Sequence, residues 1–173
     1  MPAAPAAPPA LAELTALAHT LSDIVAAIAL LGWDQEVMMP PRGGEGRAHH
    51  LATLTGIYHE KLTAPRLGEL LAALEGDPDA LTVTQRALVR ELRRERGRAV
   101  KVPPTLVREL AEAQARGVET WRRARQASDF ASFAPALAQL VALNRQVAEH
   151  VGYAGSPYDA LLDEYEPGMT AQR

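Results

Sequence analysis

Residues 11–31, LAELTALAHTLSDIVAAIALL, decide the fold class of this chain. Spacings of 3, 4, 3, 4 and 3 separate their main apolar residues, which are Leu14, Leu17, Leu21, Ile24, Ile28 and Leu31. Side chains at these intervals lie on one face of an α-helix. We therefore expect a helix from about Leu11 to Leu31, ending before the run Met38-Met39-Pro40-Pro41 and the turn Gly43-Gly44-Glu45-Gly46.

The rest of the chain carries helix signals as well. Thr82 and Gln85 form a capping-box pair, and Pro65 can start a short helix because proline is favoured at a first helical position. The pair Pro103-Pro104 interrupts the chain before the next helix. Ser132 or Asp129 is expected to cap another helix, and the run Ser156-Pro157-Tyr158-Asp159 starts a short last one that ends near Gly168. The sequence Glu75-Gly76-Asp77-Pro78 breaks the pattern. No segment alternates with period two over a useful length, so we predict an all-α fold of about seven helices in antiparallel pairs.

The same periodicity predicts which side chains face inward. The helix after the glycine-rich turn should bury Ala48, Leu51, Leu54, Ile57 or Tyr58, and Leu62. The next long helices should bury two further sets: Leu106, Leu110, Ala113, Gly117, Trp121 and Ala124 in one, and Phe133, Leu137, Leu140, Asn144, Val147 and Val151 in the other.

Composition excludes several classes of function. The 173 residues include no cysteine, which rules out disulfides, thiolate zinc sites and thiol nucleophiles and is consistent with a cytoplasmic protein. The net charge of −3 gives no general attraction to nucleic acid or to an anionic membrane. Residues 1–10, MPAAPAAPPA, are expected to be a disordered proline- and alanine-rich tail. They are not a secretory signal, because they lack its basic start and its continuous apolar run. The longest uncharged run, residues 24–33, is too short to span a bilayer, so we predict no membrane partner.

No complete catalytic or metal site is evident. His59-Glu60 opens a zinc-peptidase motif but lacks the second histidine four residues on, and the five histidines are expected to be partly exposed on the surface. No serine stands in a Gly-x-Ser-x-Gly elbow. The glycine-rich stretch 43–46 lacks the Lys-Ser/Thr of a phosphate loop, so we interpret it as a helix-connecting turn.

Residues 86–101 carry seven basic side chains against Glu91 and Glu95. A nucleic-acid surface would need aromatic residues or a groove-reading motif beside them, and neither is present. Such a face is usually solvated, or it docks on acidic surface elsewhere. The acidic residues that could fill this role, within this chain or another, are Asp159, Asp163, Glu164 and Glu166.

The segment Trp33-Asp34-Gln35-Glu36 joins apolar bulk to two acids directly after the first helix. In a purely structural interpretation, Trp33 plugs the helix end and Asp34 caps the next element. A role in a binding cleft is the other interpretation. The residues alone leave both open.

Several runs of residues resemble a known family. The run from Leu31 to Pro41, followed by Gly43, Gly44, Arg47-Ala48 and Leu51-Ala52, is similar to the opening of the carboxypeptidase Taq family of thermostable zinc metallocarboxypeptidases. Further matching positions are Lys101-Val102-Pro103, Trp121, Ala124, Asp129-Phe130, Phe133 and Pro135, and above all the run from Tyr158 to Thr170. The resemblance covers almost the whole chain after residue 10. It departs from the family at His49-His50, where an acid and an amide are more usual.

The resemblance implies the N-terminal helical part of a larger, cleft-containing enzyme that removes C-terminal residues from peptides with broad specificity. It places the zinc motif and the catalytic groups after the end of this chain, so residues 11–173 are expected to be truncated before the catalytic part and to hold no catalytic residue, metal ligand or cofactor. Zinc or another divalent metal, peptide substrates and a homodimer are implied for the parent protein. The residues expected in cleft or structural roles are Trp33, Asp34, Gln35, Glu36, Tyr158 and Asp159. A stand-alone, non-catalytic helical interaction module is the alternative. A fragment cut from a larger fold should leave apolar surface uncovered, so we expect self-association in solution.

Overall fold

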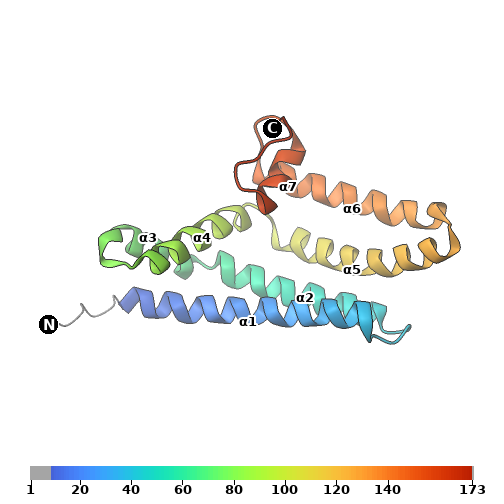
Figure 1. Cartoon of the computed structure of the whole chain (residues 1–173), viewed down its shortest axis with the longest axis horizontal. Coiled ribbons are helices and arrows are strands. Elements are labelled where there is room, and N and C mark those ends of the chain that lie inside the picture. The colour runs from blue at the N-terminus through green and yellow to red at the C-terminus, as the bar shows by residue number, and fades with distance from the viewer. Residues whose placement is uncertain (1–8, 173) are drawn as a thin grey trace. The chain divides into compact units, whose positions relative to one another are not determined.

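The computed structural model describes residues 9–172 as helices joined by short turns (Figure 1). The elements are α1 (Pro9–Val37), α2 (Gly44–Thr63), α3 (Pro65–Glu75), the 3-10 helix η1 (Pro78–Ala80), α4 (Val83–Ala99), α5 (Pro104–Ala127), α6 (Phe130–Val151) and α7 (Pro157–Tyr165). No strand occurs in this part of the chain. The predicted all-α class with seven helices is confirmed.

Local capping chemistry fixes most helix starts as predicted. Thr82 and Gln85 form a complete capping box at α4, and Ser156 and Asp159 form another at α7. Asp129, and not Ser132, is the N-cap of α6, where its carboxylate accepts a hydrogen bond from the Ser132 N–H. The predicted last helix was too long, because α7 stops at Tyr165 instead of near Gly168.

Helix α1 differs from its prediction at both ends. It begins at Pro9, so Pro9 and Ala10 belong to the helix and not to the predicted tail; residues 1–8 of that tail lie outside the described part. Proline is compatible with this position because a first helical residue needs no N–H. The helix continues past Leu31 to Val37, and the N–H groups of Met38 and Met39 both donate to the Asp34 carbonyl, at 2.9 and 2.8 Å.

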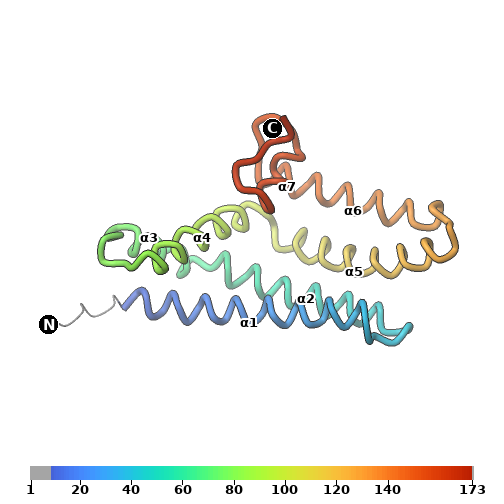
Figure 2. The backbone as a smooth tube through the Cα atoms, viewed as in Figure 1, coloured from blue at the N-terminus to red at the C-terminus, as the bar shows by residue number. Residues whose placement is uncertain are grey.

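The chain folds as two compact units. Of the residues that the structure describes, unit 1 comprises 9–27 and 57–100, and unit 2 comprises 28–56 and 101–172. Helices α1 and α2 each contribute residues to both units. Each of them is a single continuous helix in the backbone trace (Figure 2). The chain therefore passes between the units three times, at residues 27–28, 56–57 and 100–101.

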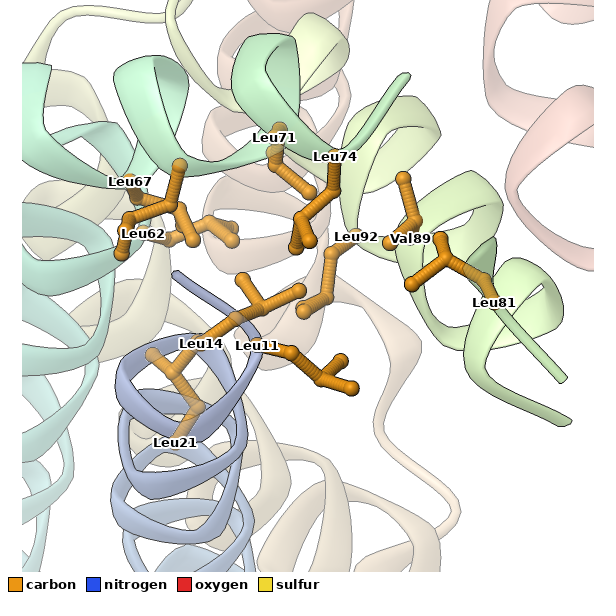
Figure 3. Close-up of a cluster of buried hydrophobic side chains, with 11 residues drawn as sticks. Leu11, Leu14, Leu21, Leu62, Leu67, Leu71, Leu74, Leu81, Val89 and Leu92 are labelled. Atoms are coloured by element: carbon orange, nitrogen blue, oxygen red, sulfur yellow. The ribbon is translucent and has the colours of Figure 1, made fainter. Parts of the chain in front are cut away.

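The core of unit 1 is almost entirely leucine. Side chains from α1, α2, α3 and α4 converge on it (Figure 3). Leu14 and Leu71 are fully buried, and Tyr58 rather than the exposed Ile57 packs against the cluster. The buried cluster consists of Leu11, Leu14, Leu21, Leu62, Leu67, Leu70, Leu71, Leu74, Leu81, Val89 and Leu92.

The basic residues of α4 find partners inside unit 1. Arg93 pairs with Glu75 of α3 at 2.6 Å, and Arg90 pairs with its neighbour Glu91 at 2.8 Å. Arg96 donates to the Thr63 carbonyl at the end of α2, at 3.2 Å. Much of the predicted basic face therefore ties α4 to the preceding helices.

Unit 2 is built on the hairpin of α5 and α6, which run antiparallel and close together (Figure 1). Gly117 permits the close approach, since a Cβ there would lie 3.1 Å from Leu140 Cδ1. Their apolar core contains Val102, Leu106, Ala113 and Leu143. The predicted inward positions Trp121 and Leu137 are wrong for this structure, because their side chains are 49% and 38% exposed.

Helix α1 is long and apolar enough to cross a membrane by length and composition, and no other helix of the described residues is. The sequence prediction rested on residues 24–33 alone, which are too short. A core helix that other parts of a protein cover has the same composition. The absence of a membrane partner stays a prediction.

Candidate functional site

The predicted residues 33–36 occupy the last turn of α1, in unit 2. There they meet the start of α2 and the middle of α5. We call this place the α1–α2–α5 junction and define it by Asp34, Gln35 and Glu36 of α1, Arg47 of α2, and Ala115, Glu119 and Arg122 of α5.

A buried arginine joins α1 to α2. Arg47 donates one hydrogen bond to the Asp34 carboxylate and another to the Leu31 carbonyl. Its side chain is only 11% exposed and that of Asp34 is 34% exposed, so the ion pair is largely shielded from water. The Arg47 Nε atom is buried without a hydrogen-bond partner among the described residues. The interpretation of Asp34 as the cap of the next element is therefore wrong, because its carboxylate pairs with the Arg47 guanidinium of α2.

Gln35 joins α1 to α5. It is 5% exposed, and its Nε2 donates to the Ala115 carbonyl at 3.0 Å, across 80 residues of sequence. A buried amide that bonds to a helix backbone fixes the distance and the register of two helices. Gln35 is thus a structural residue of the junction.

A charged cluster closes the exposed side of the junction. Arg122 contacts the Glu36 carboxylate at 3.0 Å and the Glu119 carboxylate at 2.9 Å, so one guanidinium serves two acids on different helices. The Glu119 side chain also packs against the first residue of α2, because a Cβ on Gly44 would lie 3.1 Å from Glu119 Cγ. A carboxylate beside a helix N-terminus is favoured by the helix dipole. The prediction that residues 43–46 form a helix-connecting turn is wrong for Gly44, Glu45 and Gly46, which already belong to the first turn of α2, where Gly44 leaves room for Glu119.

The junction makes a measurable contribution to stability through Gln35. Replacing Gln35 by leucine should lower the free energy of unfolding by about 1 kcal/mol, since the hydrogen bond to Ala115 is lost at nearly constant volume. Urea denaturation followed by far-UV circular dichroism measures the change. The exposed Gln114 on α5 supplies the control, because Gln114→Leu should change stability by less than about 0.5 kcal/mol. Equal effects of the two substitutions would contradict the role of Gln35.

The aromatic candidates do not belong to the junction's interior. Trp33 is 56% exposed and Tyr158 is 59% exposed, so the interpretation of Trp33 as a buried plug of the helix end is wrong. Tyr158 lines a groove of about 360 Å³ between α6 and α7, beside Leu137, Val141 and Arg145.

Asp159 has a structural role in α7. One carboxylate oxygen accepts from the Ser156 N–H at 3.0 Å and the other from the Ala171 N–H at 2.8 Å. Asp163 accepts from the Gly168 N–H at 2.9 Å in the same way. These acids therefore order the segment after α7.

Sequence reasoning missed the partners that complete the junction, namely Arg47, Glu119 and Arg122. The sequence prediction ended the first helix near Leu31, so it left Asp34 outside the helix and gave no reason to pair Asp34 with Arg47. One signal was available: Arg47 was among the residues that carried the family resemblance. The contact with α5 could not be anticipated, because about 80 residues separate its two sides.

The described residues 9–172 contain no group of three His, Asp or Glu side chains that could hold a metal ion. His59 is buried, at 5% exposure, so the prediction of surface histidines is wrong for this one.

Comparison with known proteins identifies the family. Residues 13–173 match the Carboxypeptidase Taq (M32) metallopeptidase family. Thermostable carboxypeptidase 1 of Thermus thermophilus is 40% identical over 156 residues, which cover 83% of this chain and 30% of the relative. Carboxypeptidase 1 of Bacillus subtilis is 31% identical, over 92% of this chain and 32% of the relative.

Comparison with solved structures leads to the same family. The crystal structure of BsuCP superposes with a TM-score of 0.91 at 31% identity, covering 94% of this chain and 33% of that one. The M32 carboxypeptidase of Deinococcus radiodurans R1 gives a TM-score of 0.73 at 32% identity, over 94% of this chain and 33% of that one. These matches define a helical part of a metallopeptidase. The chain belongs to the carboxypeptidase Taq (M32) family, and it spans about a third of the length of the relatives that it matches.

Proposed function

We propose that this chain is the helical N-terminal part of a metallocarboxypeptidase that removes single residues from the C-termini of peptides. The family match over residues 13–173 carries the proposal. Because the chain spans about a third of its relatives, the rest of the enzyme would come from polypeptide that it does not match.

The metal is proposed to be zinc, and it would be held by that other part. The described residues offer no three ligands close together, so we assign no catalytic step to them. When bound, such a metal polarises the scissile carbonyl and lowers the pKa of a coordinated water. The role of the chain itself is to form a wall of the substrate cleft, and the α1–α2–α5 junction gives this wall a fixed shape.

The chain by itself should neither bind metal nor cleave peptides. After dialysis against zinc, mass-spectrometric metal analysis should find far less than one equivalent per chain, and no C-terminal amino acid should be released from a model peptide. One tightly bound zinc per chain, or hydrolysis by the purified chain, would contradict the proposal.

A chimera tests whether this chain can serve as the N-terminal part of an active carboxypeptidase. In it, residues 13–173 of this chain replace the matching part of the Thermus thermophilus enzyme. We expect the chimera to release C-terminal residues within about tenfold of the rate of the parent, a barrier change of about 1.4 kcal/mol. The same enzyme without its matching part is the negative control. A folded but inactive chimera would favour a stand-alone interaction module.

A further inference from the structure

A groove of about 360 Å³ lies between α6 and α7, within unit 2. Its lining is mostly apolar, and Leu137 and Val141 stay 38% and 43% exposed although they line this hollow. Concave apolar surfaces of about 300–1,000 Å³ with a few polar groups are the usual sites for small ligands. We call this hollow the α6–α7 groove and define it by Leu137, Val141, Asn144, Arg145, Tyr158 and Leu161.

The polar side chains of the α6–α7 groove include a cation that no acid neutralises. Within residues 9–172, the Arg145 guanidinium has no acidic partner and the Tyr158 hydroxyl has no hydrogen-bond partner. None of the groove residues is acidic. Glu149, one turn after Arg145, accepts instead from the Tyr153 hydroxyl at 2.6 Å. A guanidinium and a phenol hydroxyl both donate hydrogen bonds, and a carboxylate is the acceptor that best matches a guanidinium.

Asn144 supplies an acceptor to the same groove. Its Nδ2 donates to the Leu140 carbonyl at 2.8 Å, so this end of the amide is occupied. The Asn144 Oδ1 accepts no hydrogen bond from the described part of the chain, and it is therefore available to an N–H of a ligand. The groove thus offers two donors for a carboxylate, one acceptor for an N–H, and an apolar lining.

We infer that the α6–α7 groove binds the C-terminal residue of a peptide when that residue has a large apolar side chain. Such a residue carries a free carboxylate, an amide N–H and an apolar group on one carbon atom. Arg145 and Tyr158 bind the carboxylate, and the Asn144 Oδ1 accepts from the N–H. The side chain of the ligand packs on Leu137 and Val141. The inference goes beyond the proposed function, because it assigns a binding site to residues of this chain whether or not the chain supports catalysis.

An NMR titration of the isotope-labelled chain tests the inference without any catalytic readout. N-acetyl-L-leucine is the probe, because it combines the carboxylate, the N–H and the apolar side chain. Its saturable shifts should concentrate on residues 137–145 and 157–161, with a dissociation constant on the order of 1 mM, as expected for a ligand of this size. No saturable shift at these residues would overturn the inference.

A series of related ligands separates the three features. N-acetyl-L-leucinamide, which has no charge, should bind at least about tenfold more weakly, since a charge-assisted hydrogen bond is lost. N-acetylglycine, which has no side chain, should bind about tenfold more weakly. Isocaproate, which keeps the side chain and the carboxylate but has no N–H, should bind about threefold more weakly. A tripeptide that ends in leucine should bind at least as tightly as the probe, and its C-terminal amide should not.

Substitution of Arg145 tests which cation binds the carboxylate. Arg145→Gln should weaken binding of N-acetyl-L-leucine at least about tenfold and should abolish the preference over N-acetyl-L-leucinamide. Arg123→Gln is the matched control, because Arg123 is exposed on α5, has no acidic partner among the described residues and does not line the groove. Equal effects of the two substitutions would overturn the assignment.

Substitution of Asn144 tests recognition of the N–H. Asn144→Leu should remove the preference for N-acetyl-L-leucine over isocaproate, whereas Gln146→Leu, at an exposed position of α6 outside the groove, should leave it unchanged. An unchanged preference in Asn144→Leu would overturn this contact.

The outcomes separate the inference from the proposed function. Shifts at the groove that follow protein concentration and not ligand would mean that a second copy covers it. Equal binding of isocaproate and N-acetyl-L-leucine would mean a site for simple aliphatic acids; either result overturns the inference. An active chimera together with a chain that does not bind the probe overturns the inference and leaves the proposed function intact. Binding of the probe together with an inactive chimera does the reverse.

Discussion

Replacing Leu71 by alanine is expected to lower the free energy of unfolding by about 3 kcal/mol, because a fully buried leucine loses most of its side chain. Leu71 lies in the leucine cluster of unit 1, between side chains of α1, α3 and α4 (Figure 3). The truncation removes apolar contacts and leaves a cavity that rigid neighbouring helices cannot fully close. Urea denaturation by circular dichroism gives the magnitude, and hydrogen exchange should show the loss in α3 and α4.

Leu30→Ala supplies the matched control for Leu71→Ala. It makes the same chemical change at a side chain that is 64% exposed, so it should alter the stability of the isolated chain by less than about 0.5 kcal/mol. Similar losses for the two variants would mean that the leucine cluster is not the core of unit 1.

Replacing Arg47 by methionine should be the second most damaging change, at about 2 kcal/mol. Methionine retains the apolar stem but removes the charge, which leaves the Asp34 carboxylate partly buried and unpaired. Removing one partner of a shielded ion pair costs more than the pair itself contributes, because the other charge stays desolvated. Thermal and urea denaturation measure the loss.

A double-mutant cycle isolates this effect from lost packing. Asp34→Asn in the Arg47→Met background should recover about 1 kcal/mol, because the stranded charge is removed. Arg66→Met is the control, since Arg66 pairs with Glu13 through side chains that are 57% and 43% exposed. That substitution should cost clearly less stability than Arg47→Met, because solvent screens this exposed pair. Additive effects of the Asp34 and Arg47 substitutions would show that their ion pair contributes nothing.

Features set by neighbouring residues could be predicted from the sequence. The starts of α3, α4 and α7 follow from proline at a first position or from a side chain that caps within three residues. The family resemblance, carried by the run Tyr158–Thr170 and the stretch around Trp33, is confirmed by the match over residues 13–173.

Features that depend on residues far apart in the chain could not be predicted from the sequence. The end of α1 was placed too early because Arg47 and Gln35 bind its last turns to α2 and α5, contacts that no local pattern encodes. Trp121 and Leu137 were predicted to face inward but are exposed, because helical periodicity shows which residues share a face and not whether another element covers that face. The homodimer, the peptide substrates and the cytoplasmic location remain predictions.

The way the chain passes between its two units has a genetic consequence. Because α1 and α2 both contribute to each unit, neither unit corresponds to one uninterrupted stretch of coding sequence. A recombination event anywhere between residues 28 and 100 would separate parts of both units at once. This region should therefore be inherited and exchanged as a whole, and the junctions of a working chimera should lie outside it.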